Sequence, residues 1–320
     1  MKVAVTGGFG FIGSNLVKKL LSDQHEIVVI DNLSTGSERF LNSEEKEAIN
    51  FVNLDLSNTS AKNLTSVLNG VNIVYHLAAN ADVRGGWTST FRDIEENVIA
   101  THNIALASRE SNVSEFIFAS TGCVYGDSRT IPTPETELFP IQTSLYGASK
   151  VAAEGLVSSF AANGAFKATA FRFVSVLGPN YHHGHVIDFI KKLKSNPKKL
   201  NVLGNGKQRK SYIHVSDCVA GLMNLRSELS YDVFNIGHNR YVEVIESANL
   251  VARFLGLSPE LIFENKDRGW VGDNPFTFLD IQKAIEYGWN PTIGIEDSVK
   301  ETVDWIENNP WILNKEEIRK

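Results

Sequence analysis

Several features of secreted, membrane and nucleic-acid-binding proteins are missing from this sequence. Only two cysteines occur, Cys123 and Cys218, so the chain needs no disulfide framework and suits a reducing compartment. No apolar run approaches the ~20 residues that cross a bilayer, and the first residues run into glycines rather than a signal peptide. The formal net charge of -6 argues against a general affinity for nucleic acid or anionic membranes. We therefore expect a cytoplasmic protein that binds neither nucleic acid nor a membrane.

Short apolar runs alternate with helical segments through the first half of the chain. Strands are predicted at 2–6, 26–30, 71–76, 115–120 and 167–173, and helices at 11–22, 59–69, 89–110 and 145–162. This alternation is typical of βα units, which build a parallel sheet covered on both faces. Right-handed crossovers then predict a doubly wound, Rossmann-like α/β fold.

The pattern changes after about Val174, where turn signals such as Asn-Pro and Asn-Gly appear. The segment "SYIHVSDCVAGLMNL" indicates a strand, a cap at Ser216 and a helix, and "YDVFNIG" indicates one more sheet strand. Short helices are expected after residue 243. We predict a sheet domain of residues 1–174 with 215–240, and a smaller C-terminal lobe of residues 175–214 with 241–320.

A glycine-rich turn, "VTGGFGFIGSNL", joins the first strand to the first helix. Gly7, Gly10 and Gly13 fit G-x-x-G-x-x-G, in which the missing side chains let a pyrophosphate approach the backbone and the helix N-terminus. Asp31 ends the next strand, where a carboxylate accepts hydrogen bonds from an adenosine ribose and repels a 2′-phosphate. The turn, helix and acid together predict a binding site for NAD rather than NADP.

Three further stretches are candidates for the same site. A further strand is predicted in "FVNLDL", between those at 26–30 and 71–76, and Asp55 follows it at a position suited to an adenine edge. The strand at 71–76 runs into "HLAAN", whose small residues let a cofactor lie against the backbone. In "YGASK", Tyr146 and Lys150 lie one helical turn apart and project from the same face. A phenol has a pKa near ~10, so a nearby ammonium favours its ionised form and makes it a base.

These motifs together resemble the extended short-chain dehydrogenases/reductases. The stretches "TGGFGFIG", "DNLSTG", "LDL", "HLAANADVR", "ENV", "STGCVYG", "YGASK" and "RFVSVLGP" occur in the order typical of that superfamily and cover nearly the whole chain. Within it, the sequence is most similar to nucleotide-sugar epimerases of the UDP-glucose 4-epimerase type. The resemblance implies a tightly held NAD, a nucleotide-sugar substrate and a homodimer.

The resemblance also implies roles for individual residues. Tyr146 and Lys150 match the catalytic Tyr-x-x-x-Lys, and Thr121 matches the residue that hydrogen-bonds the reacting hydroxyl. Positions that contact the cofactor are Gly7, Gly10, Phe11, Ile12, Gly13, Asp31, Asn32, Leu33, Ser34, Thr35, Gly36, Asp55, Leu56, Leu77, Ala78, Ala79, Asn80, Ala81, Asn97 and Val174, with Thr121, Tyr146 and Lys150. Positions that contact the nucleotide sugar are Ser175, His185, Val186, Asn201, Val202, Leu203, Lys210 and Asp273, with Thr121 and Tyr146.

Some positions depart from the patterns of related families. Gly122 and Cys123 stand where dehydratases of this superfamily carry an acidic pair, and decarboxylases commonly carry Glu at the position of Cys123. Both activities are therefore disfavoured. Ser175 replaces the usual Asn toward the phosphates, and Lys210 replaces an Arg that clamps the pyrophosphate with a fork that lysine lacks.

Two alternatives to a 4-epimerase remain open from the sequence. Cys123 and His185, in "GCVYG" and "GHVIDF", also fit a 3,5-epimerase of a nucleotide-linked 4-keto sugar, in which a Cys acts as acid/base. A non-catalytic, NAD-binding regulator would usually lack the Tyr or Lys. The histidines of "YHHGH" have no acidic or cysteine partners, so no metal site is predicted.

The resemblance further implies how two copies pair and which sugars fit. Relatives pair through the helix after Asn97 and the helix bearing Tyr146; the residues expected at that interface are Ile99, Ile104, Leu106, Ala152, Ala153, Leu156 and Val157. Thr277 falls at the position that gates N-acetyl groups and is smaller than the Tyr found in some relatives. We expect reversible interconversion of UDP-glucose and UDP-galactose, and tolerance of the N-acetyl sugars.

Overall fold

The computed structural model describes residues 1–137 and 141–318 and contains a seven-stranded parallel sheet. Its strand order is β11-β6-β5-β4-β1-β2-β3, so the chain starts in the middle and winds outward in both directions. The strands are β1 (Lys2–Thr6), β2 (Glu26–Asp31), β3 (Ile49–Asn53), β4 (Ile73–His76), β5 (Glu115–Ala119), β6 (Lys167–Phe173) and β11 (Tyr231–Ile236). The doubly wound fold predicted from the sequence is confirmed.

Alternate residues of each central strand enter two different hydrophobic cores. Val3 and Val5 of β1 pack with α1 (Phe11–Ser22) and α7 (Val215–Asn224) on one face, whereas Ala4 packs toward the opposite face. The second face is covered by α3 (Ala61–Val67), α4 (Ala100–Glu110) and α5 (Leu145–Ala162). Because both faces are buried, the strands read as nearly continuous apolar runs.

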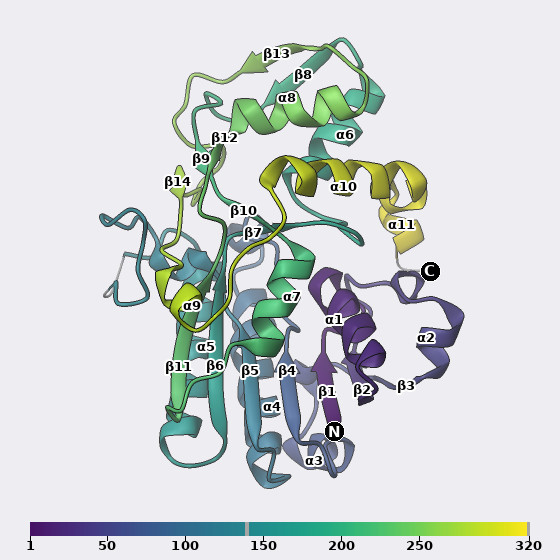
Figure 1. Cartoon of the computed structure of the whole chain (residues 1–320), viewed down its shortest axis with the longest axis vertical. Coiled ribbons are helices and arrows are strands. Elements are labelled where there is room, and N and C mark those ends of the chain that lie inside the picture. Colours follow the sequence, from purple (N-terminus) through teal and green to yellow (C-terminus); the bar gives the residue numbers. More distant parts are fainter. Residues whose placement is uncertain (138–140, 319–320) are drawn as a thin grey trace.

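A smaller lobe lies beyond the carboxyl ends of the strands, above the sheet in Figure 1. Its helices α6 (His185–Ser195), α8 (Val244–Phe254) and α10 (Ile295–Asn308) continue the core that contains Val3 and Val5. Small sheets complete it: β10 (Tyr212–His214) with β7 (Ser175–Leu177), β13 (Glu260–Phe263) with β8 (Lys199–Val202), and the order β12 (Val242–Glu243), β9 (Arg209–Lys210), β14 (Phe276–Thr277). The exact domain limits predicted from the sequence stay a prediction.

Shorter elements fill the connections of both parts. They are α2 (Ser43–Glu47), α9 (Gln282–Glu286), α11 (Lys315–Ile318), a π turn at Ile94–Ile99, and 3₁₀ turns at Glu38–Phe40, Leu56–Asn58, Gly85–Trp87, Gly122–Tyr125 and Pro310–Leu313. Within the described part of the chain, no helix combines the length and the apolar character needed to cross a membrane.

Three local predictions were wrong. The helix expected at 89–110 begins only at residue 92, and its segment Ile94–Ile99 is a π turn that places the buried side chain of Asn97 toward the loop after β4. The cap of α7 is His214 rather than Ser216: its Nδ1 accepts a hydrogen bond from the Ser216 N–H at 3.2 Å. The region after 243 also contains α10, a helix of 14 residues.

The expected dimer interface also needs correction. Ile104, Ala153 and Val157 are fully buried against the sheet, so they are core residues of one chain. The other expected residues, Ile99, Leu106, Ala152 and Leu156, are half-buried or exposed and stay a prediction; Ile94 and Val151 are exposed near them. The sequence pattern did not separate the two faces of these helices because small and branched apolar residues occur on both.

A buried ion pair fixes α5 on the sheet. The guanidinium of Arg172 on β6 binds both carboxylate oxygens of Glu154 on α5, at 2.7 and 3.0 Å. The Ser120 hydroxyl donates to the same carboxylate, and the Tyr125 hydroxyl accepts from Arg172 at 2.8 Å. Because Glu154 lies two turns after Tyr146, this pair sets the position of the helix that carries the candidate base.

Replacing Arg172 with Met is expected to lower the free energy of unfolding by about 3–5 kcal/mol, because Glu154 would keep a buried, uncompensated charge. Urea unfolding followed by circular dichroism measures the change. The matched control is Lys300→Met, which breaks an exposed i,i+4 pair with Asp304 and should cost less than about 0.5 kcal/mol. Equal losses in the two variants would contradict the role given to the Arg172–Glu154 pair.

Candidate functional site

The glycine turn forms a closely packed cradle at the start of α1. Gly7 has a φ of 68°, and a Cβ there would lie 2.8 Å from the backbone nitrogen of Ala78. At Gly13 a Cβ would lie 2.0 Å from the Gly7 carbonyl oxygen. Gly10 caps α1 without a side-chain hydrogen bond, so the first N–H groups of the helix have no side-chain cap. This cradle fits a dinucleotide pyrophosphate at a helix N-terminus.

Asp31 lies at the end of β2, directly beside this cradle. Its two carboxylate oxygens accept hydrogen bonds from the backbone N–H groups of Phe9 at 2.9 Å and Leu33 at 2.8 Å. Burial raises the pKa of Asp31, and these two hydrogen bonds act in the opposite direction. The loop that contains Leu33 closes on the cradle through Gly36, where a Cβ would lie 2.4 Å from the Phe9 carbonyl oxygen.

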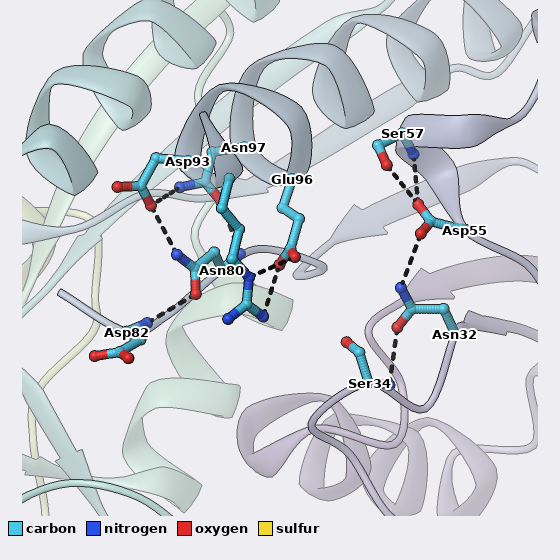
Figure 2. Close-up of polar contacts among 10 residues, drawn as sticks. Asn32, Ser34, Asp55, Ser57, Asn80, Asp82, Asp93, Glu96 and Asn97 are labelled. Carbon is cyan, nitrogen blue, oxygen red and sulfur yellow. Dashed lines mark hydrogen bonds and ion pairs between the residues drawn. The ribbon is translucent and has the colours of Figure 1, made fainter. Parts of the chain in front are cut away.

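The candidate adenine end is a polar chain of exposed side chains, shown on the right of Figure 2. Asn32 donates to Asp55 at 3.4 Å, and the other Asp55 oxygen accepts from the backbone and the hydroxyl of Ser57 at 2.9 and 2.7 Å. Partial burial works against ionisation of Asp55, but the hydrogen bonds of Ser57 and Asn32 leave its pKa lowered. Ser34 and Thr35 are exposed nearby, whereas the Leu56 side chain is buried in the core.

The loop after β4, which contains Leu77 to Ala81, is bound to two helices by a pair of amides (Figure 2). The side-chain oxygen of Asn97 accepts a hydrogen bond from the Asn80 backbone N–H at 2.8 Å. The side-chain nitrogen of Asn97 donates to the Ser149 hydroxyl at 2.8 Å. Ser149 in turn donates to the Tyr146 carbonyl oxygen at 2.8 Å. Both ends of the fully buried Asn97 amide are therefore engaged, and they place the cofactor-side loop relative to the catalytic helix.

A second buried chain of hydrogen bonds connects this loop to the glycine turn. The Thr6 hydroxyl accepts from the backbone N–H groups of Leu77 and Ala78 at 3.2 Å, so it donates to His76 Nδ1 at 2.7 Å. Thr101 donates its hydroxyl hydrogen to the Asn97 backbone carbonyl at 2.6 Å and accepts from His76 Nε2 at 2.9 Å. Burial lowers the pKa of His76 to about 3, so this imidazole is a neutral structural link.

Two candidate catalytic residues, Tyr146 and Thr121, are joined by a hydrogen bond. Tyr146 is half-buried in the first turn of α5, and Thr121 lies two residues after the end of β5. Burial raises the pKa of Tyr146 and Cys123 acts in the same direction, while a hydrogen bond with Thr121 lowers it. In the chain alone the pKa of Tyr146 is therefore raised rather than lowered as expected from Lys150, because burial disfavours a phenolate.

Lys150 is almost fully buried, and its ammonium lies 4.3 Å from the centre of the Phe118 ring. Burial lowers the pKa of Lys150 to about 7, and the charge of Glu154 one turn further along α5 partly opposes this. Cys123 is half-buried, with its backbone N–H bound to the Thr121 hydroxyl at 3.1 Å. Burial raises the pKa of the Cys123 thiol, so a neutral thiol is the form that faces this site.

On the side of the smaller lobe, two predicted ligand-binding residues are bound to each other. Lys210 on β9 donates to an Asp273 oxygen at 2.9 Å and to the Asn274 carbonyl oxygen. The other Asp273 oxygen accepts from the Gly269 backbone N–H at 2.9 Å, and Asp273 is 2% exposed. Lys210 is thus held in place by a fixed partner, which leaves the remaining ammonium hydrogen for a ligand.

The other predicted substrate contacts differ in what they offer. His185, at the start of α6, stacks on Tyr212 at 4.8 Å and bonds the Ser247 hydroxyl through Nε2 at 2.8 Å; burial and Lys210 lower its pKa to about 4. Ser175 and Asn201 are exposed, and Leu203 is half-buried. Val174, Val186 and Val202 are buried in the core as whole residues, so they offer almost no exposed atoms to a ligand.

Comparisons with known proteins agree with this site. A family model described as the NAD dependent epimerase/dehydratase family matches residues 3–237. The chain belongs to this family. Its superfamily, the extended short-chain dehydrogenases/reductases, is the one that the motifs indicated, and the family's cofactor is NAD.

The relatives of this family member include several epimerases. A putative UDP-glucose 4-epimerase of Methanocaldococcus jannaschii is 31% identical and aligns over 96% of this chain and 99% of its own length. A crystal structure of a UDP-galactose 4-epimerase is 36% identical, has a TM-score of 0.85, and matches 97% of this chain and 100% of its own. The UDP-glucose 4-epimerase of Thermotoga maritima, crystallised with UDP-glucose, is 30% identical with a TM-score of 0.86 over 97% and 100% of the two chains.

Two site residues of this family member were missed in the sequence. Ser149 lies inside "YGASK" and was passed over because its role depends on Asn97, which is distant in the chain. Asp93 is 1% exposed and accepts from Asn80 at 2.8 Å, and its other oxygen has no hydrogen-bond partner among the described residues. Asp93 lies one helical turn before Asn97, and this spacing could have indicated that the two side chains lie on the same face of the helix.

The low pKa of Lys150 predicts how stability depends on pH in the NAD-free protein. An unfolded lysine has a pKa of about 10.4, so between about pH 7 and pH 10 the unfolded chain binds more protons at this residue and stability rises with pH. Relative to Lys150→Met, which cannot titrate, the wild type should gain of order 1 kcal/mol per pH unit in this window. Urea unfolding of both proteins at several pH values measures the difference. A constant difference would refute the buried, perturbed lysine.

Proposed function

We propose that this protein catalyses the NAD-dependent, reversible 4-epimerisation of a nucleotide-diphospho-hexose through a transient 4-keto sugar. UDP-glucose and UDP-galactose are the proposed pair. The observation that carries the proposal is the grouping of Tyr146, Thr121 and buried Lys150 at the carboxyl edge of the sheet, beside the glycine cradle and facing the lobe that contains Lys210. The proposed reaction needs the reacting groups at the edge of the sheet and a nucleotide-binding group in the smaller lobe opposite them.

The residues present suit NAD as the resident cofactor. A Cβ at Gly7 or Gly13 would collide with the backbone that forms the cradle, and the carboxylate of Asp31 binds the Phe9 N–H of the same turn. When bound, NAD accepts a hydride from C4 of the sugar and returns it. Asp31 favours a free ribose over a 2′-phosphate, because two negative groups would repel each other there.

Each catalytic residue has a separate task in this proposal. Thr121 holds the C4 hydroxyl, so that the proton and the hydride leave in one fixed geometry. Tyr146 accepts the hydroxyl proton and later returns it to the C4 oxygen, when the hydride is delivered to the opposite face of C4. Lys150 supplies positive charge close to the phenol and a donor toward the nicotinamide ribose. Because burial keeps the Tyr146 phenol protonated in the chain alone, forming the base depends on positive charge gathered at the site.

The smaller lobe is proposed to hold the nucleotide and leave the sugar free to turn. Inversion requires the 4-keto sugar to present its second face without leaving the enzyme, so the anchor must act on the nucleotide and diphosphate. Lys210 and Asp273, fixed by each other, are proposed for that anchor together with residues 201–203. UDP is proposed as the nucleotide because the Thermotoga maritima enzyme was crystallised with UDP-glucose.

The rival 3,5-epimerase is less well supported by the geometry. Burial raises the pKa of the Cys123 thiol as it does that of the Tyr146 phenol, so this shift by itself does not separate the two candidates. His185 is neutral and bonded to Ser247, so its Nε2 is engaged within the lobe. Intact Tyr146, Lys150 and Thr121 argue against a non-catalytic regulator. Thr277 lies opposite Lys210 in the neighbouring strand. Three expectations from the sequence stay predictions: the tolerance of N-acetyl sugars, the homodimer and the cytoplasmic location.

Replacing Tyr146 with Phe is expected to lower turnover of UDP-galactose by at least about 10³-fold while leaving NAD bound, because only the proton acceptor is lost. Initial rates and the NAD content of the purified protein measure the two effects. Tyr287→Phe removes an exposed hydroxyl far from the candidate site and serves as the matched control. Retention of activity within about tenfold would remove Tyr146 from the catalytic role.

The site of hydrogen exchange distinguishes the proposed reaction from the 3,5-epimerase. The enzyme is incubated with UDP-galactose in deuterated water, and the product is followed by NMR. UDP-glucose without deuterium at carbon is expected, since the C4 hydride returns to the sugar it came from. Deuterium at C3 or C5 would overturn the proposal. So would inertness toward UDP-galactose combined with reaction of a 4-keto-6-deoxy sugar that Cys123→Ser abolishes.

A further inference from the structure

One buried hydrogen-bond donor of the smaller lobe has no partner within the described part of the chain. It is the indole Nε1–H of Trp270, which is shielded from solvent. A buried donor left unpaired costs about 1–3 kcal/mol, so native proteins rarely keep one without a reason. Since an indole nitrogen donates and never accepts, the missing partner must be an acceptor.

Two cationic side chains lie near the ring of Trp270. The Lys210 ammonium is 5.9 Å from the ring centre and the Arg84 guanidinium is 5.8 Å away. Lys210 belongs to the lobe, whereas Arg84 lies in the segment that follows the carboxyl end of β4, the central strand of the sheet. Arg84 also binds Asp188 in the first turn of α6 at 3.0 Å. The indole therefore marks a point where the cofactor-side loop and the lobe converge.

The segment that carries Trp270 is tied down on both sides of the indole. Arg268 binds Asp127 at 2.6 Å, and Asn274 donates to the Gly126 carbonyl oxygen at 2.6 Å. The Thr143 hydroxyl donates to the Gly272 carbonyl oxygen at 3.3 Å, three residues before Tyr146. These contacts fix the segment against the catalytic side of the molecule, so the indole is placed before any ligand arrives.

The three groups gathered here are all donors. An ammonium, a guanidinium and an indole N–H offer hydrogens and no lone pairs. Sugar hydroxyls both donate and accept, whereas phosphate oxygens only accept and carry negative charge. Lys210 and Arg84 each already bind one carboxylate, Asp273 and Asp188. Their remaining N–H groups and the indole N–H are donors, which suits a diphosphate better than the hexose.

We infer that Trp270 is a binding residue for the nucleotide sugar, and that its indole N–H donates to a diphosphate oxygen held between Lys210 and Arg84. The ligand class rests on the proposed function. The position of Trp270 also gives the lobe a rigid contact with the diphosphate, about which a released 4-keto sugar turns.

The test uses the full-length, NAD-loaded protein with UDP as the probe. Trp270→Phe keeps an aromatic ring and removes the N–H. The matched control is Trp311→Phe, since the Trp311 indole already donates to the Asn309 oxygen at 3.3 Å. A hydrogen bond to a charged group is worth enough that UDP should bind about tenfold to a hundredfold more weakly to Trp270→Phe by calorimetry, and equally well to Trp311→Phe. Thermal melting confirms that both variants are folded.

Nitrogen-15 NMR of the tryptophan indoles supplies a readout that a purely structural role would not change. The indole resonance that disappears in Trp270→Phe should shift when UDP is added to the wild type. Unchanged UDP affinity in Trp270→Phe, an unshifted indole resonance, or absence of UDP binding by the wild type would each overturn the inference. If UDP binding depends on Trp270 but no epimerisation occurs, the inference stands and the proposed function fails.

Discussion

The buried amide of Asn97 is the contact on which the arrangement of the site depends. One end holds the Asn80 backbone and the other holds Ser149, which binds the Tyr146 carbonyl oxygen. Through Thr101, His76 and Thr6 the same region reaches the backbone of Leu77 and Ala78, against which Gly7 packs. The cofactor cradle and the catalytic helix therefore share one hydrogen-bonded support, and a shift in either would leave buried polar groups unpaired.

Burial sets the charge state of the catalytic pair. It raises the pKa of Tyr146 and lowers that of Lys150 to about 7, so both side chains are driven toward their neutral forms. The negative charge of Glu154 raises the pKa of Lys150 and so opposes the effect of burial, although Glu154 also forms an ion pair with Arg172. The candidate base, Tyr146, is therefore protonated in the chain alone. The proposed proton transfer thus depends on positive charge brought to the site.

The smaller lobe is joined to the sheet domain by apolar packing and by fixed polar contacts. A single hydrophobic core runs from Val3 and Val5 to the helices of the lobe. The pairs Arg84–Asp188 and Arg268–Asp127 connect segments of the two parts near the proposed substrate. Such joints hold the two parts in a fixed arrangement, so the groups proposed to bind the nucleotide are in place before it arrives.

Much of this protein was determined locally by its sequence. The helix Leu145–Ala162 and the strand Lys167–Phe173 match their predictions residue for residue, because cap, periodicity and turn signals agree there. The glycine turn and Asp31 were predicted because the close approach of backbone to pyrophosphate leaves few alternatives to glycine. These are properties of neighbouring residues, and the order of the motifs along the chain then indicated the family.

Only the tertiary structure decided what depends on partners distant in the chain. It paired Lys210 with Asp273. It also placed Trp270 beside Arg84 and Lys210, with no hydrogen-bond partner for its N–H among residues 1–137 and 141–318. It also assigned Ile104, Ala153 and Val157 to the core rather than to an interface, and it reversed the expected shift in the pKa of Tyr146. Desolvation is the common physical reason. The free energy of a charge or a polar group depends on everything packed around it, which no local pattern of residues records.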